Sequence, residues 1–195
     1  MNNKAFFLIV ISFLASVANQ LTAQLWADIQ SGKKALIPET LYLRKQISGG
    51  SIITLLDTNS RNKPGVCNFD ENILRTGRIL IFDQVALTYK SGATTGLEGA
   101  LAYDAAAPKE LQNAIFTISQ DGSIKFSKPF KDLHNSETGT NSNDEYTELK
   151  SLSLLVDDKP ISMTLQFADG VVLDDSTVKH YIEIRLNGLA TSARA

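Results

Sequence analysis

The longest stretch of alternating side chains lies near the middle of the chain, in residues 78–90. Apolar residues dominate both sets of alternate positions: Ile79, Ile81, Val85, Leu87 and Tyr89 in one set, and Leu80, Phe82, Ala86 and Thr88 in the other. Because successive side chains of a strand point to opposite faces, this pattern predicts a strand that is buried on both faces. Such a strand requires a covering layer on each side.

Seven other stretches with a period of two predict further strands at residues 39–47, 51–57, 111–120, 123–128, 148–157, 161–168 and 177–186. Turn residues separate them, and Gln120-Asp121-Gly122 is typical of a hairpin. The last two strands alternate cleanly between apolar and polar residues, so they should be half exposed. The sequence therefore predicts an all-β fold, an eight-stranded antiparallel β-sandwich. The strand count matches a single jelly roll, and another Greek-key order remains open.

Three long connections interrupt this pattern, at residues 58–77, 91–110 and 129–147. Loops of this length inside a compact domain are usually functional or contain short elements of their own. Residues 129–134 suit one helical turn, and residues 135–144 are almost entirely polar, which predicts an exposed tip.

The N-terminal segment has helical rather than strand periodicity. An apolar face and a polar stripe continue from about Lys4 to Ile29, which predicts one helix about 40 Å long. Two interpretations remain open. Residues 1–24 also have the features of an export signal cleaved after Ala18 or Ala23; a retained helix would serve as a membrane anchor, with membrane contact through residues 5–29, or as an assembly arm. The expected division is residues 1–32 for this segment and 33–195 for the β-sandwich.

Composition narrows the possible partners. The chain has 195 residues, 43% of them hydrophobic, which suffices for one sizeable core. Its formal charge of −2 and the lack of Lys/Arg clusters argue against direct binding to nucleic acid. The single cysteine, Cys67, cannot form an internal disulfide, and we expect it to be a small, partly buried residue.

The sequence contains no pattern typical of a catalytic or metal site. His134 and His180 are far apart and have no metal-ligand spacing, and residues 92–96 lack the lysine of a phosphate-binding loop. Acidic residues are paired at Asp144-Glu145, Asp157-Asp158 and Asp174-Asp175, and we expect these carboxylates to be solvated turn residues. We therefore predict a protein that is not an enzyme, with no catalytic, cofactor-binding or metal-binding residues and no cofactor.

Several segments resemble the jelly-roll structural proteins of tailless bacterial viruses, particularly those that infect Bacteroidetes. These segments are residues 68–89, 111–126, 129–133 and 181–188, and together they span most of residues 65–188. The resemblance implies a virion structural protein, a capsid subunit that forms homo-oligomers and contacts other virion proteins. The chain has about half the length that a double jelly roll needs, so the resemblance implies a single one.

A second hypothesis follows from the export-signal interpretation. After cleavage, the chain would be a secreted or periplasmic β-sandwich that acts as a binding or adhesion module, with a ligand site in its long loops. The two hypotheses place the protein in the virion or outside the cell membrane, respectively.

Overall fold

The structure is a computed structural model that describes residues 3–134, 145–174 and 176–193. Its strands are β1 (Lys34–Ile47), β2 (Ile52–Leu56), β3 (Leu80–Gly92), β4 (Ile115–Gln120), β5 (Ser123–Pro129), β6 (Thr147–Leu155), β7 (Ile161–Gln166) and β8 (Lys179–Ala193). Its helices are α1 (Asn3–Ser16), η1 (Ala18–Gln20), α2 (Ala23–Gln30), α3 (Lys109–Gln112) and η2 (Phe130–Asp132). All eight predicted strands are present. The polar tip predicted at residues 135–144 lies outside the described residues.

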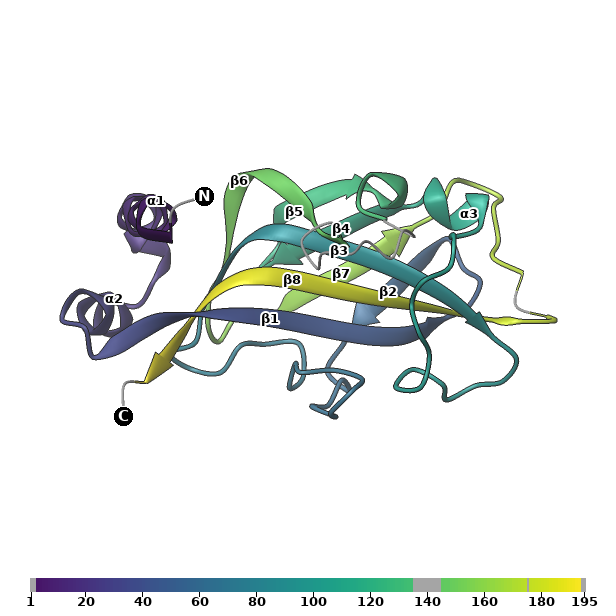
Figure 1. Cartoon of the computed structure of the whole chain (residues 1–195), viewed down its shortest axis with the longest axis horizontal. Coiled ribbons are helices and arrows are strands. Elements are labelled where there is room, and N and C mark those ends of the chain that lie inside the picture. Colours follow the sequence, from purple (N-terminus) through teal and green to yellow (C-terminus); the bar gives the residue numbers. More distant parts are fainter. Residues whose placement is uncertain (1–2, 135–144, 175, 194–195) are drawn as a thin grey trace.

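The strands form two antiparallel four-stranded sheets (Figure 1). Sheet A has the order β1-β8-β3-β6, and sheet B has the order β2-β7-β4-β5. The pairs are nested along the chain, since the first strand pairs with the eighth, the second with the seventh, the third with the sixth and the fourth with the fifth. The predicted hairpin joins β4 to β5 through Asp121 and Gly122, with φ of 52° and 76°.

One apolar core fills the space between the sheets, and every strand contributes to it. Phe82 of β3 and Phe116 of β4 are fully buried, and the Phe116 ring meets Phe126 of β5 edge to face at 6.2 Å. Leu111 and Phe130, from the short helices α3 and η2, belong to the same core. The strand predicted at residues 111–120 therefore begins later, because its first residues form a helical turn that inserts Leu111.

Both faces of β3 are buried, as predicted, but the faces exchange at Asp83. A β-bulge there shifts the register between Phe82 and Gln84 against both neighbouring strands. The extra residue reverses the alternation. Five residues of β3 consequently face sheet B: Leu80, Phe82, Val85, Leu87 and Tyr89. The prediction that Val85 shares a face with Ile81 is wrong, because Ile81 packs on the outer side of sheet A.

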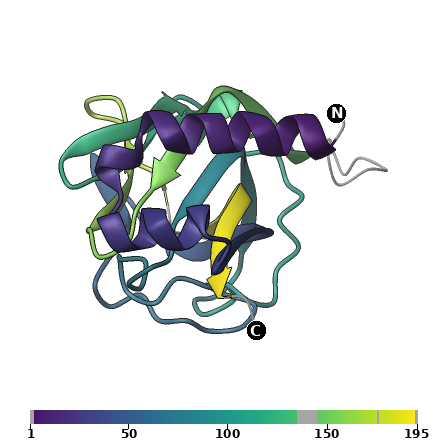
Figure 2. The same cartoon turned by 90° about the vertical axis from the view of Figure 1, so that its left-hand side faces the viewer.

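The N-terminal segment forms two helices joined by the turn η1, where one helix was predicted. Leu21 is extended, and the Thr22 hydroxyl caps α2 by accepting a hydrogen bond from the Leu25 N–H at 3.2 Å. The chain reverses at this break, so α1 and α2 lie side by side across one end of the sandwich (Figure 2). A single helix of about 40 Å could not place both halves on this surface.

The two helices cover an apolar patch on the outer face of sheet A. Val10 and Leu14 of α1 and Leu25 of α2 are buried there. Their cluster includes residues in or directly beside β3, β6 and β8: Ile79, Ile81, Leu154, Val156 and Leu189. Since burial of each such side chain contributes about 1.5–3 kcal/mol, the N-terminal helices form a structural layer over β3.

The outer side of β8 is more buried than its alternating pattern predicted. Tyr181 and Glu183 are only 0% and 6% exposed. The connection between β3 and α3 lies over them, and the Tyr181 hydroxyl donates a hydrogen bond to the Thr94 carbonyl. The connection between β3 and α3 therefore covers the outer face of β8, which the alternating sequence pattern had predicted to be exposed.

Replacing the central core ring tests the sandwich. Phe82→Ala removes a fully buried side chain, and we expect the free energy of unfolding to fall by about 3–5 kcal/mol. Val172→Ala, at a side chain 64% exposed, is the control and should change it by less than about 0.5 kcal/mol. Urea unfolding measures both. Equal effects of the two variants would contradict the position of Phe82 between the sheets.

A second stability test addresses the bulge. A Cβ atom on Gly188 would lie 1.9 Å from the Ile81 carbonyl oxygen, so Gly188→Ala must displace the backbone of β3. The corresponding Cβ on Gly99 would meet its nearest neighbour, Val66, at 3.4 Å. We expect Gly188→Ala to lower the melting temperature by at least about 2–4 °C, corresponding to 1 kcal/mol or more in a chain of this size, and Gly99→Ala to change it little. A Gly188→Ala variant as stable as the control would disprove the close approach.

Candidate functional site

His134 is held as a neutral imidazole in a structural position. Its Nδ1 lies 3.0 Å from the Leu87 carbonyl oxygen and must donate, while Nε2 accepts a hydrogen bond from the Ala107 N–H at 3.2 Å. Burial lowers the pKa of His134, and the bond to Leu87 only partly opposes this effect. Both ring nitrogens are therefore engaged in joining residues 107 and 134 to β3.

Both ring nitrogens of His180 also form hydrogen bonds. Its Nε2 donates to the Asp174 carbonyl oxygen at 2.7 Å, which leaves Nδ1 to accept a hydrogen bond from the Tyr89 hydroxyl at 2.7 Å. Burial raises the pKa of Tyr89, so this phenol remains a donor. The structure does not bring the two histidines together.

The paired acids have structural partners where the structure describes them. Asp157 accepts a hydrogen bond from the Gly77 N–H at 2.5 Å and is 6% exposed, and Asp158 accepts one from the Thr76 hydroxyl at 2.9 Å. The expectation that these turn acids are all solvated is thus wrong for Asp157, because it fixes the segment that leads into β3. Asp144 and Asp175 lie outside the described residues.

The remaining members of the pairs also have partners. Glu145 forms an ion pair with Arg185 at 2.6 Å. Asp174 accepts a hydrogen bond from the Ser176 N–H at 3.0 Å. Glu145 therefore joins the segment before β6 to β8, and Asp174 stabilises its own turn.

Cys67 is buried, at 3% exposure, and its sulfur accepts a hydrogen bond from the Phe69 N–H at 3.2 Å. Burial raises the pKa of the thiol, which keeps it protonated. The residue therefore has the environment of a packing cysteine rather than of a nucleophile.

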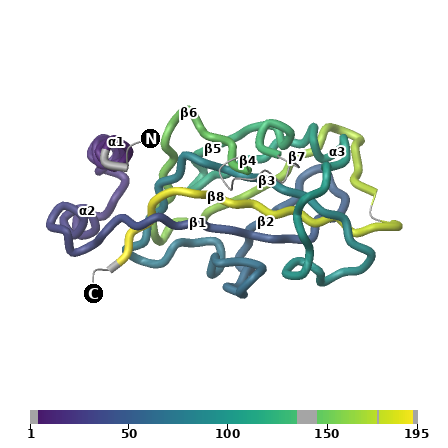
Figure 3. The backbone as a smooth tube through the Cα atoms, in the orientation of Figure 1, coloured from purple at the N-terminus to yellow at the C-terminus, as the bar shows by residue number. Residues whose placement is uncertain are grey.

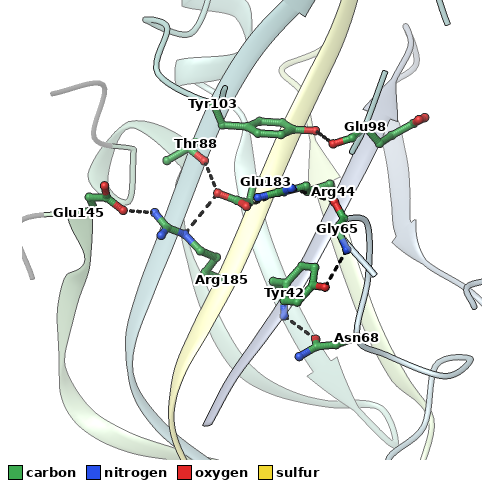
Figure 4. A network of polar contacts seen from close by, with 10 residues as sticks. All are labelled: Tyr42, Arg44, Gly65, Asn68, Thr88, Glu98, Tyr103, Glu145, Glu183 and Arg185. Carbon is green, nitrogen blue, oxygen red and sulfur yellow. Dashed lines mark hydrogen bonds and ion pairs between the residues drawn. The ribbon is translucent and has the colours of Figure 1, made fainter. Parts of the chain in front are cut away.

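A polar network on the outer face of sheet A centres on Glu183 of β8 (Figure 4). One carboxylate oxygen pairs with Arg44 Nε at 2.7 Å. The other accepts a hydrogen bond from the Thr88 hydroxyl at 3.1 Å and lies 3.3 Å from Arg185 Nε. This group could not be predicted from the sequence, because its members come from three different strands. The polar residues that alternate along β8 were the available signal.

This network fastens three loops to sheet A. Arg44 donates to the Gly65 carbonyl oxygen at 2.8 Å, and its guanidinium lies 5.3 Å from the centre of the Tyr103 ring. Arg185 lies 5.0 Å from the Tyr146 ring. Figure 3 shows the connection between β2 and β3 running along the free side of β1, where the Arg44 N–H bonds to Val66. Because the charged side chains of the network form ion pairs with one another, the network holds the loops in place rather than offering a free charge.

The outer face of α1 is apolar and exposed. Phe7, Leu8 and Ile9 are 45%, 59% and 52% exposed, and we refer to these three residues as the α1 patch. A helix that is apolar all round is normally buried on all sides, whereas sheet A covers only one side of α1. The sequence predicted an apolar N-terminal helix. Which of its apolar side chains stay exposed could not be predicted, because this depends on how α1 packs on sheet A.

A groove of about 540 Å³ adjoins the α1 patch. Its lining comes from α1 and from all four strands of sheet A: Phe6, Phe7, Leu36, Pro38, Asp83, Gln84, Glu148, Asn187, Gly188 and Leu189. Asp83 is the bulged residue of β3. Burial, and then the negative charge of Glu148, raise the pKa of Asp83. Within the described residues neither carboxylate forms an ion pair.

The described residues contain neither a helix that could span a membrane nor a cluster of metal-binding side chains. No helix there is long and apolar enough to cross a membrane. No group of three or more His, Cys, Asp or Glu side chains there could hold a metal ion.

Comparison with protein families and with curated proteins finds no match for this chain. The features that distinguish the surface of the described residues are the α1 patch, its adjoining groove and the clamped loops.

The neutral His134 predicts a pH dependence. Because its pKa is lower in the folded protein than in the unfolded chain, the unfolded chain binds more protons as the pH falls below about 6.5. The stability contributed by neutral His134 is present above that pH and is lost as the pH decreases toward the lowered pKa. His134→Gln should therefore lose less stability than wild type between pH 7.5 and pH 5.

Urea midpoints at the two pH values measure this difference. Asp83 titrates in the opposite direction, because its raised pKa favours folding on acidification, but it is present in both proteins and cancels in the comparison. Identical pH dependence in wild type and variant would contradict the environment described for His134.

Proposed function

We propose that the two sheets form a single jelly roll. The nested pairing of strands is what supports this proposal, since a jelly roll arises when an eight-stranded hairpin folds over into two sheets. The strand orders β1-β8-β3-β6 and β2-β7-β4-β5 follow from that folding. Consecutive strands then alternate between the sheets except for the β4–β5 hairpin, as they do here.

We propose that the protein is a non-enzymatic structural component of a virion, which assembles as a homo-oligomer and contacts other virion proteins. The observation that carries the proposal is the exposed α1 patch beside a groove whose lining is partly apolar and partly acidic. A surface of this kind on a soluble protein is typical of an interaction site. The resemblance of several segments within residues 65–188 to jelly-roll virion proteins is the reason for proposing this kind of assembly.

The position of the patch suits a contact between identical subunits. Phe7 belongs to the patch and also lines the groove. A projecting apolar group and a hollow on the same face can interlock with a second copy across a two-fold axis. This arrangement would cover Leu8 and Ile9, which are otherwise exposed to water.

The secreted binding module stays the alternative. It requires removal of residues up to Ala18 or Ala23, which would uncover Ile81, Leu154 and Leu189 on sheet A. Packing of the N-terminal helices on that surface favours a retained segment. The mass of the native protein distinguishes the two: an intact N-terminal segment supports the virion component, and a chain that starts near Asn19 or Gln24 supports the secreted module.

Introducing a charge in the α1 patch tests the proposed assembly. Leu8 is 59% exposed, so Leu8→Glu should leave the subunit folded and convert the full-length oligomer to a monomer. Val172→Glu places the same charge at a side chain 64% exposed in the loop between β7 and β8, and it should assemble like wild type. Size-exclusion chromatography with light scattering gives the masses. A wild-type chain that is monomeric without detergent would disprove assembly through α1.

A further inference from the structure

The outer face of sheet B carries no charged side chain. In β2, β4 and β7 its outward positions hold only Ile, Thr, Ser and Gln. The two lysines of β5 point away from this outer face. The Lys125 amine lies 3.4 Å from the Gln20 side chain of η1, and the Lys128 amine lies 6.0 Å from the centre of the Phe126 ring. In a chain with 21% charged residues, a solvent-exposed sheet face without charge is unusual, because protein surfaces are normally rich in charged side chains.

The centre of this face is a row of hydroxyl groups. Strand register places Thr54, Thr164, Thr117 and Ser127 opposite one another across all four strands. The Thr117 and Ser127 hydroxyls are 2.9 Å apart, which shows that they project on the same side. Exposed aliphatic side chains extend the surface at its margins, with Ile52 60% and Ile124 69% exposed. We refer to this surface as the hydroxyl face.

The chemistry of the hydroxyl face excludes several kinds of partner. Nucleic acid requires cationic side chains, and an interfacial membrane contact uses basic residues together with large apolar ones. The aromatic rings of sheet B, Phe116 and Phe126, belong to the core between the sheets, so none is available to stack on a sugar. A flat, uncharged protein surface is the partner that remains.

We propose that the hydroxyl face packs against the hydroxyl face of a second copy of this chain. Two identical faces without charge meet without like-charge repulsion, and each hydroxyl can both donate and accept a hydrogen bond. A two-fold axis through the face brings the same central residues of both copies together. This contact is separate from the α1 patch. The inference rests on the proposed function in one respect, which is that both surfaces serve assembly.

At the β5 edge of sheet B, pairing by strand addition is less favourable than this face contact. β5 has a register shift beyond Ile118–Phe126 and ends in Pro129, and its Lys128 is paired with the inward-facing Phe116. A bulge, a proline and an inward charge at an edge are features that prevent edge-to-edge pairing. These features of β5 favour a contact through the face of sheet B over one through this edge.

The size of the face indicates a weak contact. Four strands about 4.8 Å apart and six residues long cover about 400 Å², roughly half of the ~800 Å² that each partner buries in a standard stable interface. Alone, the hydroxyl face should associate only at high protein concentration. Combined with a second contact at α1, the same weak interaction becomes effective, because linked contacts raise the local concentration.

A cysteine at the centre of the face tests the proposal. The chain has one native cysteine, and Cys67 is 3% exposed, so an introduced thiol is the reactive one. Thr164→Cys is combined with Leu8→Glu, which removes the α1 contact, and the full-length protein is treated with a short bis-maleimide cross-linker at increasing concentration. The control is Thr95→Cys in the same background, at an exposed position in the connection between β3 and α3.

We expect Thr164→Cys to give at least about tenfold more cross-linked dimer than Thr95→Cys, and the excess to disappear when Thr117→Lys adds a charge beside it. Circular dichroism and the melting temperature verify that each variant is folded. A yield from Thr164→Cys no higher than that of the control, or one unaffected by Thr117→Lys, would overturn the proposal. Light scattering of Leu8→Glu alone reports on the α1 contact, so failure of either contact can be recognised independently.

Discussion

The burial of β3 on both faces is the constraint on which the rest of the structure depends. Leu80 and Phe82 require sheet B on one side, and Ile79 and Ile81 require a second cover on the other. The N-terminal helices provide that cover at one end of sheet A. Toward the other end of β3, Thr88 belongs to the network around Glu183, which holds the long loops over the sheet. The apolar side chains of β3 therefore explain the helical layer, and its Thr88 links the strand to the network that holds the loops.

The bulge at Asp83 links the fold to the surface proposed for assembly. It changes which residues of β3 face the core, and Gly188 permits the close backbone approach that accompanies it. The bulge also places a carboxyl group beneath α1, where burial raises its pKa. Because the same residue lines the groove beside the α1 patch, the shape and charge of that groove follow from the local irregularity of β3.

The strand count, the hairpin at Asp121-Gly122 and the double burial of β3 could be predicted from periodicity, since each depends on local sequence. The break between α1 and α2 was missed, although Thr22 is a typical N-cap residue. Asp83, a charge within an otherwise apolar strand, was the available signal for the bulge. The network around Glu183 could not be predicted, because its partners Arg44 and Arg185 meet only through the order of strands in sheet A.

Because α1 packs on β3, it should be protected from solvent together with the folded domain. Amide hydrogen exchange of the full-length chain measures the stability of residues 10–16 and of β3 in one experiment. If α1 covers β3 as described, its amides should exchange at least about 1,000-fold more slowly than those of an unstructured chain, as expected for a segment packed on the core. Exchange of α1 at the unstructured rate while β3 stays protected would contradict this claim.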